Sequence, residues 1–136
     1  MQIQEIKNNK DISDFLNVVK LIYKDNKAFI RPLNKDIEFV FNKEKNKYFK
    51  HGKCIRWILK DGEKCIGRIA AFVNEKYTSQ FPNVGGIGFF ECINNQNAAN
   101  LLFDTAKKWL QEQGMQYADG PINFQEKDKF WGLTLD

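Results

Sequence analysis

The hydrophobic pattern of the chain changes from strand-like to helix-like near residue 94. Residues 87–93 form a β-branched and aromatic run, which is typical of a mostly buried strand. Apolar residues then recur at helical spacing as far as Gly114, and polar residues fill the opposite face. A short stretch at 115–118, which we expect to be a second strand, follows almost at once. The pattern predicts a strand, a long helix over about 95–113 and a second strand, joined as a right-handed parallel crossover.

Helical spacing and capping residues predict three further helices. A stripe of apolar residues predicts a helix over 12–23, and Asp11 is the residue that we expect to cap it. Asn34 and Asn123 can cap two shorter helices, which run through Phe41 and over 125–130.

Residues 54–59 and 64–73 are rich in Ile, Trp and Val and predict two strands. Asp61-Gly62 lies between them and is a strong hairpin signal. Gly67-Arg68, inside the second strand, predicts a bulge or a place where a neighbouring group approaches closely. Residues 2–7 are expected to add an edge strand.

With 136 residues, of which 43% are hydrophobic, the chain can bury one core, so we expect a single domain over residues 1–136. The sequence has no apolar run long enough to cross a membrane and no signal-peptide pattern, which predicts a cytoplasmic protein without a membrane partner. The net charge is +4, but 17 acidic residues are interspersed among 21 Lys and Arg. This balance favours an anionic ligand and argues against nucleic acid as the main partner.

Three cysteines, Cys54, Cys65 and Cys92, fall inside predicted strands and lie far apart in the sequence. Their odd number and wide spacing fit neither a disulfide framework nor a metal site. We therefore expect buried, reduced thiols and no bound metal.

Two basic features allow both a functional and a structural interpretation. Residues 43–53 mix lysines with aromatic residues and His51, which resembles phosphate-binding surfaces but also suits a solvated connection. Arg68 could contact a phosphate, pair with an acid or point to solvent. His51 has no nucleophile or metal-ligand pattern beside it, which argues against a catalytic role.

The order of the predicted elements, together with several short motifs, resembles the GNAT superfamily of acyl-CoA N-acyltransferases. The similarity is to a bacterial GNAT-like branch, and its motifs span nearly the whole chain. They are Tyr23 with Ile30-Arg31-Pro32-Leu33, Asp61-Gly62, Ile66-Gly67-Arg68-Ile69-Ala70-Ala71, Gly88-Phe89-Phe90-Glu91, and Gly114 with Gly120-Pro121-Ile122-Asn123.

The resemblance implies an α/β (α+β) fold in which a twisted, mixed and mostly antiparallel sheet has helices on both faces. It also implies that acetyl-CoA or another acyl-CoA enters where the strand holding Phe89 splays from the strand at 115–118, with its pyrophosphate at the start of the long helix. The expected cofactor contacts are Phe89, Phe90, Cys92, Ile93, Asn95, Gln96, Asn97, Ala98, Ala99 and Asn123. The acceptor would be an amine of unknown identity.

The strand-helix junction departs from the usual GNAT pattern. Residues 93–99 read INNQNAA and contain no glycine, whereas the superfamily usually has a glycine-rich loop that closes round the pyrophosphate. Side chains at 95–99 limit the approach of a phosphate, so we expect a lower affinity for CoA than glycine-loop relatives have.

Glu91 resembles the position that some members of the superfamily use as a general base. A structural carboxylate paired with a lysine or arginine is the other interpretation of this residue. The tyrosine that usually acts as the acid has no counterpart after the second strand, and Tyr117 is the nearest phenol.

The chain ends in an apolar stretch at Trp131, Leu133 and Leu135, where a domain would not usually stop. We expect the domain to be incomplete at its C-terminus and to lack the final hairpin of GNAT folds. An uncovered strand edge invites pairing with another copy, so a homo-oligomer is one expected arrangement.

The best function from sequence is therefore an acyl-CoA-dependent N-acyltransferase. A non-catalytic GNAT-fold module that binds a metabolite or partner, or the front part of a larger protein, is the alternative. A basic nucleic-acid-binding module is the third.

Overall fold

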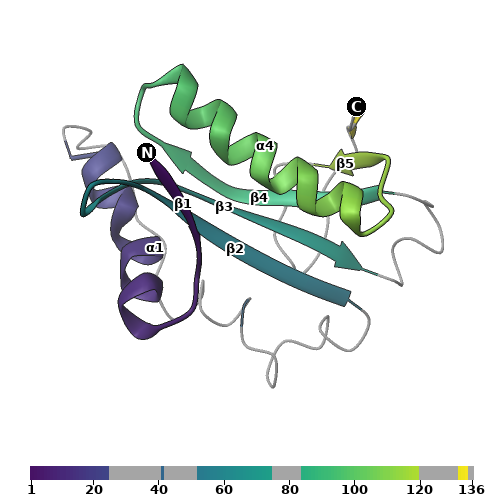
Figure 1. Cartoon of the computed structure of the whole chain (residues 1–136), viewed down its shortest axis with the longest axis horizontal. Coiled ribbons are helices and arrows are strands. Elements are labelled where there is room, and N and C mark those ends of the chain that lie inside the picture. Colours follow the sequence, from purple (N-terminus) through teal and green to yellow (C-terminus); the bar gives the residue numbers. More distant parts are fainter. Residues whose placement is uncertain (25–40, 42–51, 75–83, 120–131, 135–136) are drawn as a thin grey trace.

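The computed structural model describes residues 1–24, 41, 52–74, 84–119 and 132–134. Figure 1 shows these residues in colour and the rest of the chain as a grey trace. Within the described residues, the helices are α1 (Asn9–Ile22) and α4 (Gln96–Glu112), and the strands are β1 (Gln2–Glu5), β2 (Gly52–Asp61), β3 (Lys64–Asn74), β4 (Val84–Cys92), β5 (Tyr117–Asp119) and β6 (Gly132–Thr134).

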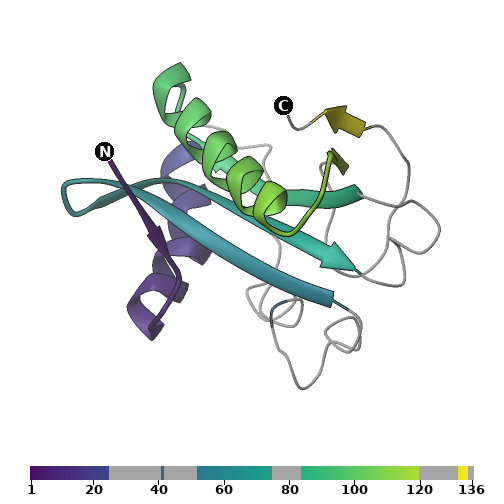
Figure 2. The same ribbon diagram turned by 45° about the vertical axis from the view of Figure 1, so that its right-hand side comes forward.

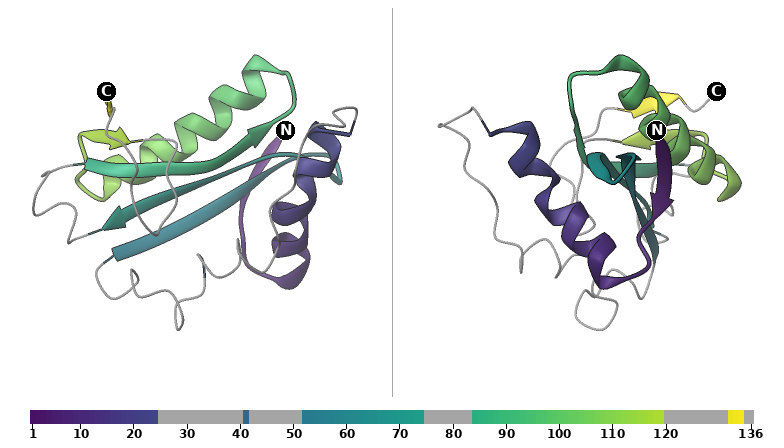
Figure 3. Two further views of the ribbon diagram at one scale, coloured as in Figure 1. Left: turned by 180° about the vertical axis from the view of Figure 1, so that it is seen from behind. Right: turned by 60° about the vertical axis from the view of Figure 1, so that its left-hand side comes forward.

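The strands form one six-stranded sheet in the order β1-β2-β3-β4-β5-β6. Neighbours pair antiparallel except β4 and β5, which are parallel because α4 carries the chain from one end of the sheet back to the other. The two helices cover opposite faces of the sheet, as the right panel of Figure 3 shows. The predicted fold class, a mixed and mostly antiparallel sheet with helices on both faces, is confirmed.

Helix α4 confirms the predicted period change. Asn95 caps it by accepting a hydrogen bond from the Ala98 N–H at 3.1 Å, and Gly114 follows it in the left-handed conformation at φ 84°. One stripe, spaced at four residues, is fully buried against the sheet: Ala98, Leu102, Ala106 and Leu110.

Helix α1 begins earlier than expected, because Asn8 caps it instead of Asp11. The Asn8 side chain accepts a hydrogen bond from the Asp11 N–H at 2.8 Å, and the Asp11 carboxylate accepts one from the Lys7 N–H at 3.1 Å. This reciprocal arrangement satisfies two free donors at the start of the helix. The expectation that Asp11 is the cap was wrong by one turn.

The β2–β3 hairpin forms around Gly62, as predicted, and contains a bulge. Gly67 pairs with Leu59, whereas Cys65 already pairs with Lys60, so Ile66 is the extra residue. A Cβ atom at Gly67 would lie 2.7 Å from Leu102 Cδ1 of α4. Both expectations for this position, a bulge and a close approach, are confirmed.

The far side of the sheet differs from expectation in one respect. Strand β5 begins at Tyr117, two residues later than predicted, and β6 pairs antiparallel with it (Figure 2). The outer edge of β5 is therefore covered, and the expectation that this strand forms the open edge was wrong. Among the described residues, a single strand and not a hairpin follows β5. The predicted helices at 34–41 and 125–130 lie outside the described residues, apart from Phe41.

Arg68 of β3 joins the sheet to α1. Its side chain is buried, with 4% of its surface exposed, and donates to the Phe15 carbonyl from Nη1 at 2.8 Å and to the Phe89 carbonyl from Nε at 3.0 Å. The guanidinium also lies 4.8 Å from the centre of the Phe15 ring. Arg68 therefore links α1, β3 and β4 and does not point to solvent.

Replacing Arg68 by Met should destabilise the fold by about 2–4 kcal/mol, because two buried carbonyls lose charge-assisted hydrogen bonds. Urea unfolding measures this free energy. Lys53→Met, on an exposed position of β2, is the matched control and should change stability by less than about 0.5 kcal/mol. Equal effects of the two substitutions would contradict the linking role of Arg68.

Candidate functional site

The pairing between β4 and β5 covers only the first residues of β4. Val84, Gly85 and Gly86 pair with the three residues of β5, and the described pairing ends there. The second half of β4, which carries Glu91, therefore has β3 on one side and no described strand on the other. This is where the resemblance placed the entry of acyl-CoA.

A bulge in β4 decides which way its second half faces. Gly88 pairs with Ala70 and Glu91 pairs with Arg68, so Phe89 and Phe90 together lie opposite Ile69. Phe89 has the left-handed conformation at φ 55°, which is rare for a residue with a side chain. The Arg68 bond to the Phe89 carbonyl holds the chain in this conformation.

Side chains before and after the bulge face different sides. Ile87 packs in the core under α4, but Phe89 packs among aromatic rings on the α1 side, 6.3 Å from Phe15 and 5.1 Å from Phe41 between ring centres. Phe90 then returns to the α4 side and stacks on Phe103, with ring centres 4.4 Å apart. Regular alternation from Ile87 would have placed Phe89 and Glu91 under α4. The bulge moves Glu91 to the α1 side.

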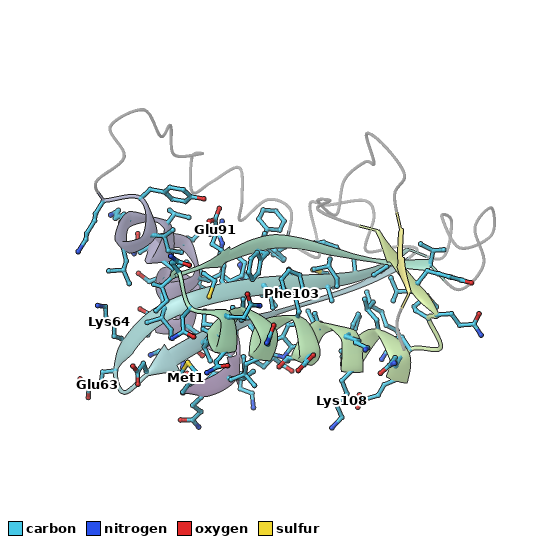
Figure 4. All side chains as sticks on the ribbon, turned by 90° about the horizontal axis from the view of Figure 1, so that it is seen from above. Met1, Glu63, Lys64, Glu91, Phe103 and Lys108 are labelled. Atoms are coloured by element: carbon cyan, nitrogen blue, oxygen red, sulfur yellow. The ribbon has the colours of Figure 1, made fainter. Side chains whose placement is uncertain are left out.

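A cavity of about 630 Å³ lies at the end of the sheet where α1 ends and α4 begins. In Figure 4, Lys64 marks this end, beside the turn of the β2–β3 hairpin. Among the described residues, the lining side chains include two lysines and no acid, so this part of the lining is positively charged. The cavity is lined by Leu21, Ile22, Lys24, Lys64, Phe90, Cys92, Ile93, Asn94, Asn95, Gln96 and Ala99.

The start of α4 contributes fewer free amides than expected. The N–H groups of Asn95, Ala98 and Ala99 already donate to Ile93 O, Asn95 Oδ1 and Asn95 O. The amides of Gln96 and Asn97 remain, since the first turn of a helix has no intrahelical acceptor for them. The first turn also contains no acidic residue that would balance the positive end of the helix dipole.

The predicted cofactor contacts divide into three groups. Six of them line the cavity: Phe90, Cys92, Ile93, Asn95, Gln96 and Ala99. Three do not, because Phe89 faces α1, Ala98 is fully buried in the core and the exposed Asn97 lies outside the lining. Asn123 lies outside the described residues.

Sequence reasoning missed the residues that α1 and the β2–β3 hairpin supply to the cavity. Ile22 was assigned to the apolar stripe of the first helix, Lys24 to its end and Lys64 to the start of a strand, and Leu21 had no assigned role. Nothing in their spacing indicated that residues 24 and 64 would meet near residue 95.

Glu91 is half-buried on the α1 side, where the Tyr23 hydroxyl donates to Glu91 Oε2 at 2.8 Å. Figure 4 shows Glu91 on the side of the sheet opposite α4. This hydrogen bond raises the pKa of the Tyr23 phenol, since the nearby carboxylate opposes formation of a second negative charge, and burial adds to the effect. Within the described residues, the partner of Glu91 is therefore a phenol and not the lysine or arginine that a structural carboxylate would take.

Tyr117, the phenol that lies nearest in sequence to the expected acid, is not close to this pair. It pairs with Val84 at the other end of β4, and 44% of its surface is exposed.

The three cysteines are free thiols and are half-buried, not fully buried as expected. Burial raises the pKa of Cys65 to about 11 and also raises the pKa of Cys92, so both thiols stay protonated at neutral pH. Cys92 therefore meets the cavity as a small neutral group. Across the described ranges, no cluster of three or more His, Cys, Asp or Glu side chains could hold a metal ion. In the same ranges, the helices are too short or too polar to cross a membrane.

No protein-family model matches the chain. Protein YghO of Escherichia coli K12 is 26% identical over 121 residues, which are 85% of this chain and 30% of YghO. The chain therefore spans about a third of the length of this curated relative.

Solved structures match most of the chain. A tandem GNAT protein from the clavulanic acid biosynthesis pathway matches 86% of this chain and 35% of its own, with a TM-score of 0.67 and 8% identity. A GNAT family acetyltransferase from Brucella melitensis, in complex with acetyl-CoA, matches 89% of this chain and 76% of its own, with a TM-score of 0.59 and 9% identity. These similarities establish the fold.

Proposed function

We propose that this chain, which has the GNAT fold, is an acyl-CoA-dependent N-acyltransferase domain. The observation that carries the proposal is the cavity beside β4. Its described lining is positively charged and adjoins the start of α4. Glu91 lies between two lining residues of β4, and its carboxylate faces the opposite side of the sheet.

The cavity suits the phosphates of CoA because three segments of the chain place positive or hydrogen-bond-donating groups around it. Lys24 follows the end of α1, Lys64 begins β3, and Gln96, whose backbone amide is free, begins α4. We infer that the two lysines supply the attraction that a glycine-rich loop provides in other members of the superfamily. Apolar side chains from Leu21, Phe90 and Ile93 would contact the less polar parts of the cofactor.

The Brucella protein with the same fold contains acetyl-CoA, which supports this ligand class for the present chain. An amine acceptor would then approach from the α1 side, where Glu91 lies.

Glu91 is the group that we assign to proton transfer. The amine nitrogen attacks the thioester carbonyl carbon and loses a proton to the Glu91 carboxylate. The carbon–sulfur bond breaks, its electron pair stays with the sulfur of CoA, and the thiolate takes up a proton from water while the protonated Glu91 returns its proton to water. Glu91 Oε1 is the oxygen that accepts the proton, because Oε2 already accepts the Tyr23 hydrogen bond.

A non-catalytic module that binds CoA is the second candidate. The absence of a glycine-rich loop at residues 93–99 favours it. Acylation of an amine by the wild type would favour the first candidate, and CoA binding without acylation would favour the second.

Replacing Asn97 by Glu should weaken the binding of CoA by about 1 kcal/mol or more, since the new carboxylate would lie in the first turn of α4, next to the lining residue Gln96, and would repel the phosphates. Isothermal titration calorimetry measures the change. An acidic residue in the first turn stabilises a helix, so the variant should remain folded.

Gln116→Glu, which adds the same charge on an exposed position beyond α4, is the matched control and should bind like the wild type. If the Asn97 variant, the control and the wild type bind CoA with equal affinity, the cofactor does not bind at the start of α4.

Replacing Glu91 by Gln should lower kcat by about a hundredfold, because the amide cannot accept the proton at neutral pH. The affinity for CoA should change by less than about twofold, since the side chain faces away from the cavity. Release of free CoA thiol from acetyl-CoA, with a panel of primary amines as acceptors, gives the rate. CoA binding without turnover in the wild type would favour the non-catalytic module.

A further inference from the structure

Tyr23 and Glu91 connect two chain segments that both line the cavity. Leu21, Ile22 and Lys24 precede and follow Tyr23 at the end of α1, and Phe90 and Cys92 flank Glu91 on β4. The hydrogen bond between the two side chains therefore joins the walls of the cavity from the side of the sheet opposite α4.

From this geometry we propose that Tyr23 is a positioning residue for the transfer reaction, which holds the Glu91 carboxylate so that Oε1 faces the acceptor amine. The inference rests on the proposed function and adds a residue to it. Tyr23 does not take part in proton transfer. It acts only through Glu91.

The backbone around this pair is already held by other contacts. Arg68 bonds to the Phe15 carbonyl of α1 and the Phe89 carbonyl of β4, and these bonds fix the separation of the two elements. A glutamate side chain still has several rotatable bonds, and fixing a long side chain in one orientation costs conformational entropy. The Tyr23 hydroxyl, at 2.8 Å, is the contact that selects the orientation of Glu91.

The chemistry of the pair suits positioning better than acid catalysis. Tyr23 donates to the ionised carboxylate, and such a hydrogen bond is stronger than one between neutral groups. The raised pKa of the phenol keeps its proton in place at neutral pH, so the donor is always present. One carboxylate oxygen is occupied and the other has no partner among the described residues.

A purely structural role, in which Tyr23 only anchors the end of α1, makes a different kinetic prediction. An anchoring residue would lower stability and would affect the rate whether or not Glu91 is present. A residue that acts through Glu91 matters only while the carboxylate is there. A double-mutant cycle on kcat therefore separates the two roles.

The test compares the wild type, Tyr23→Phe, Glu91→Gln and the double variant, with acetyl-CoA and the panel of primary amines. Tyr23→Phe should lower kcat by about ten- to a hundredfold, because a misplaced base loses rate steeply. Its affinity for CoA should stay within about twofold of the wild type. In the Glu91→Gln background the same substitution should lower kcat no further. Tyr117→Phe, an exposed tyrosine at the other end of β4, is the control and should keep full activity.

A second measurement needs no turnover. The absorbance of tyrosinate is measured against pH in the wild type. Comparison with Tyr23→Phe identifies the Tyr23 signal, and selective labelling of tyrosine identifies it if that variant does not fold. Glu91→Gln should lower the pKa of Tyr23 towards its usual value, because the neighbouring negative charge is removed.

Each outcome decides a separate point. Three results would overturn the positioning role and leave the proposed function standing. In the first, the wild type turns over and Tyr23→Phe keeps the same kcat. In the others, Tyr23→Phe lowers kcat equally in both backgrounds, or the pKa of Tyr23 does not change in Glu91→Gln. A wild type that neither binds acetyl-CoA nor acylates any amine would overturn the proposed function and the inference with it.

Discussion

The guanidinium of Arg68 bonds two backbone carbonyls that belong to different elements, and the arrangement of the site depends on this contact. One carbonyl, at Phe15, lies on α1, and the other, at Phe89, lies in the bulge of β4. A buried cation is stable only when hydrogen bonds replace its hydration, and these carbonyls supply them. In return, the guanidinium holds Phe89 in a left-handed conformation that a phenylalanine rarely adopts.

As a consequence, the two faces of β4 present different side chains. After the bulge, Phe90 and Cys92 face the cavity and Glu91 faces α1 and Tyr23. A regular strand would have placed Glu91 under α4 and left the α1 side without a carboxylate at this point. In the proposed function, one face of this strand contacts the cofactor and the other presents the base to the amine. Lysines from α1 and β3 give the cavity its charge without a glycine-rich loop.

The sequence predicted the elements whose signals are local and missed the contacts that only the assembled fold creates. The period of the apolar residues and Gly114 were enough for α4, and Asp61-Gly62 was enough for the hairpin. The cap of α1 was misassigned because Asn8 and Asp11 both suit that position and bond reciprocally. The bulge at Phe89 gave no signal, since the Arg68 side chain that bonds its carbonyl lies far away in sequence. Lys24, Lys64 and Tyr23 could not be assigned to the site because their partners lie far away in sequence.

Mapping the backbone amides that respond to CoA tests the central claim, that the cofactor lies between the end of β4 and the start of α4. In ¹H–¹⁵N NMR spectra of the ¹⁵N-labelled chain, titration with CoA should shift the amides of Gln96 and Asn97 most, followed by those from Phe90 to Ile93. Amides of β1 and of the α1 start should stay unchanged. Shifts that spare the start of α4 and gather elsewhere, or no shift at saturating CoA, would contradict the account.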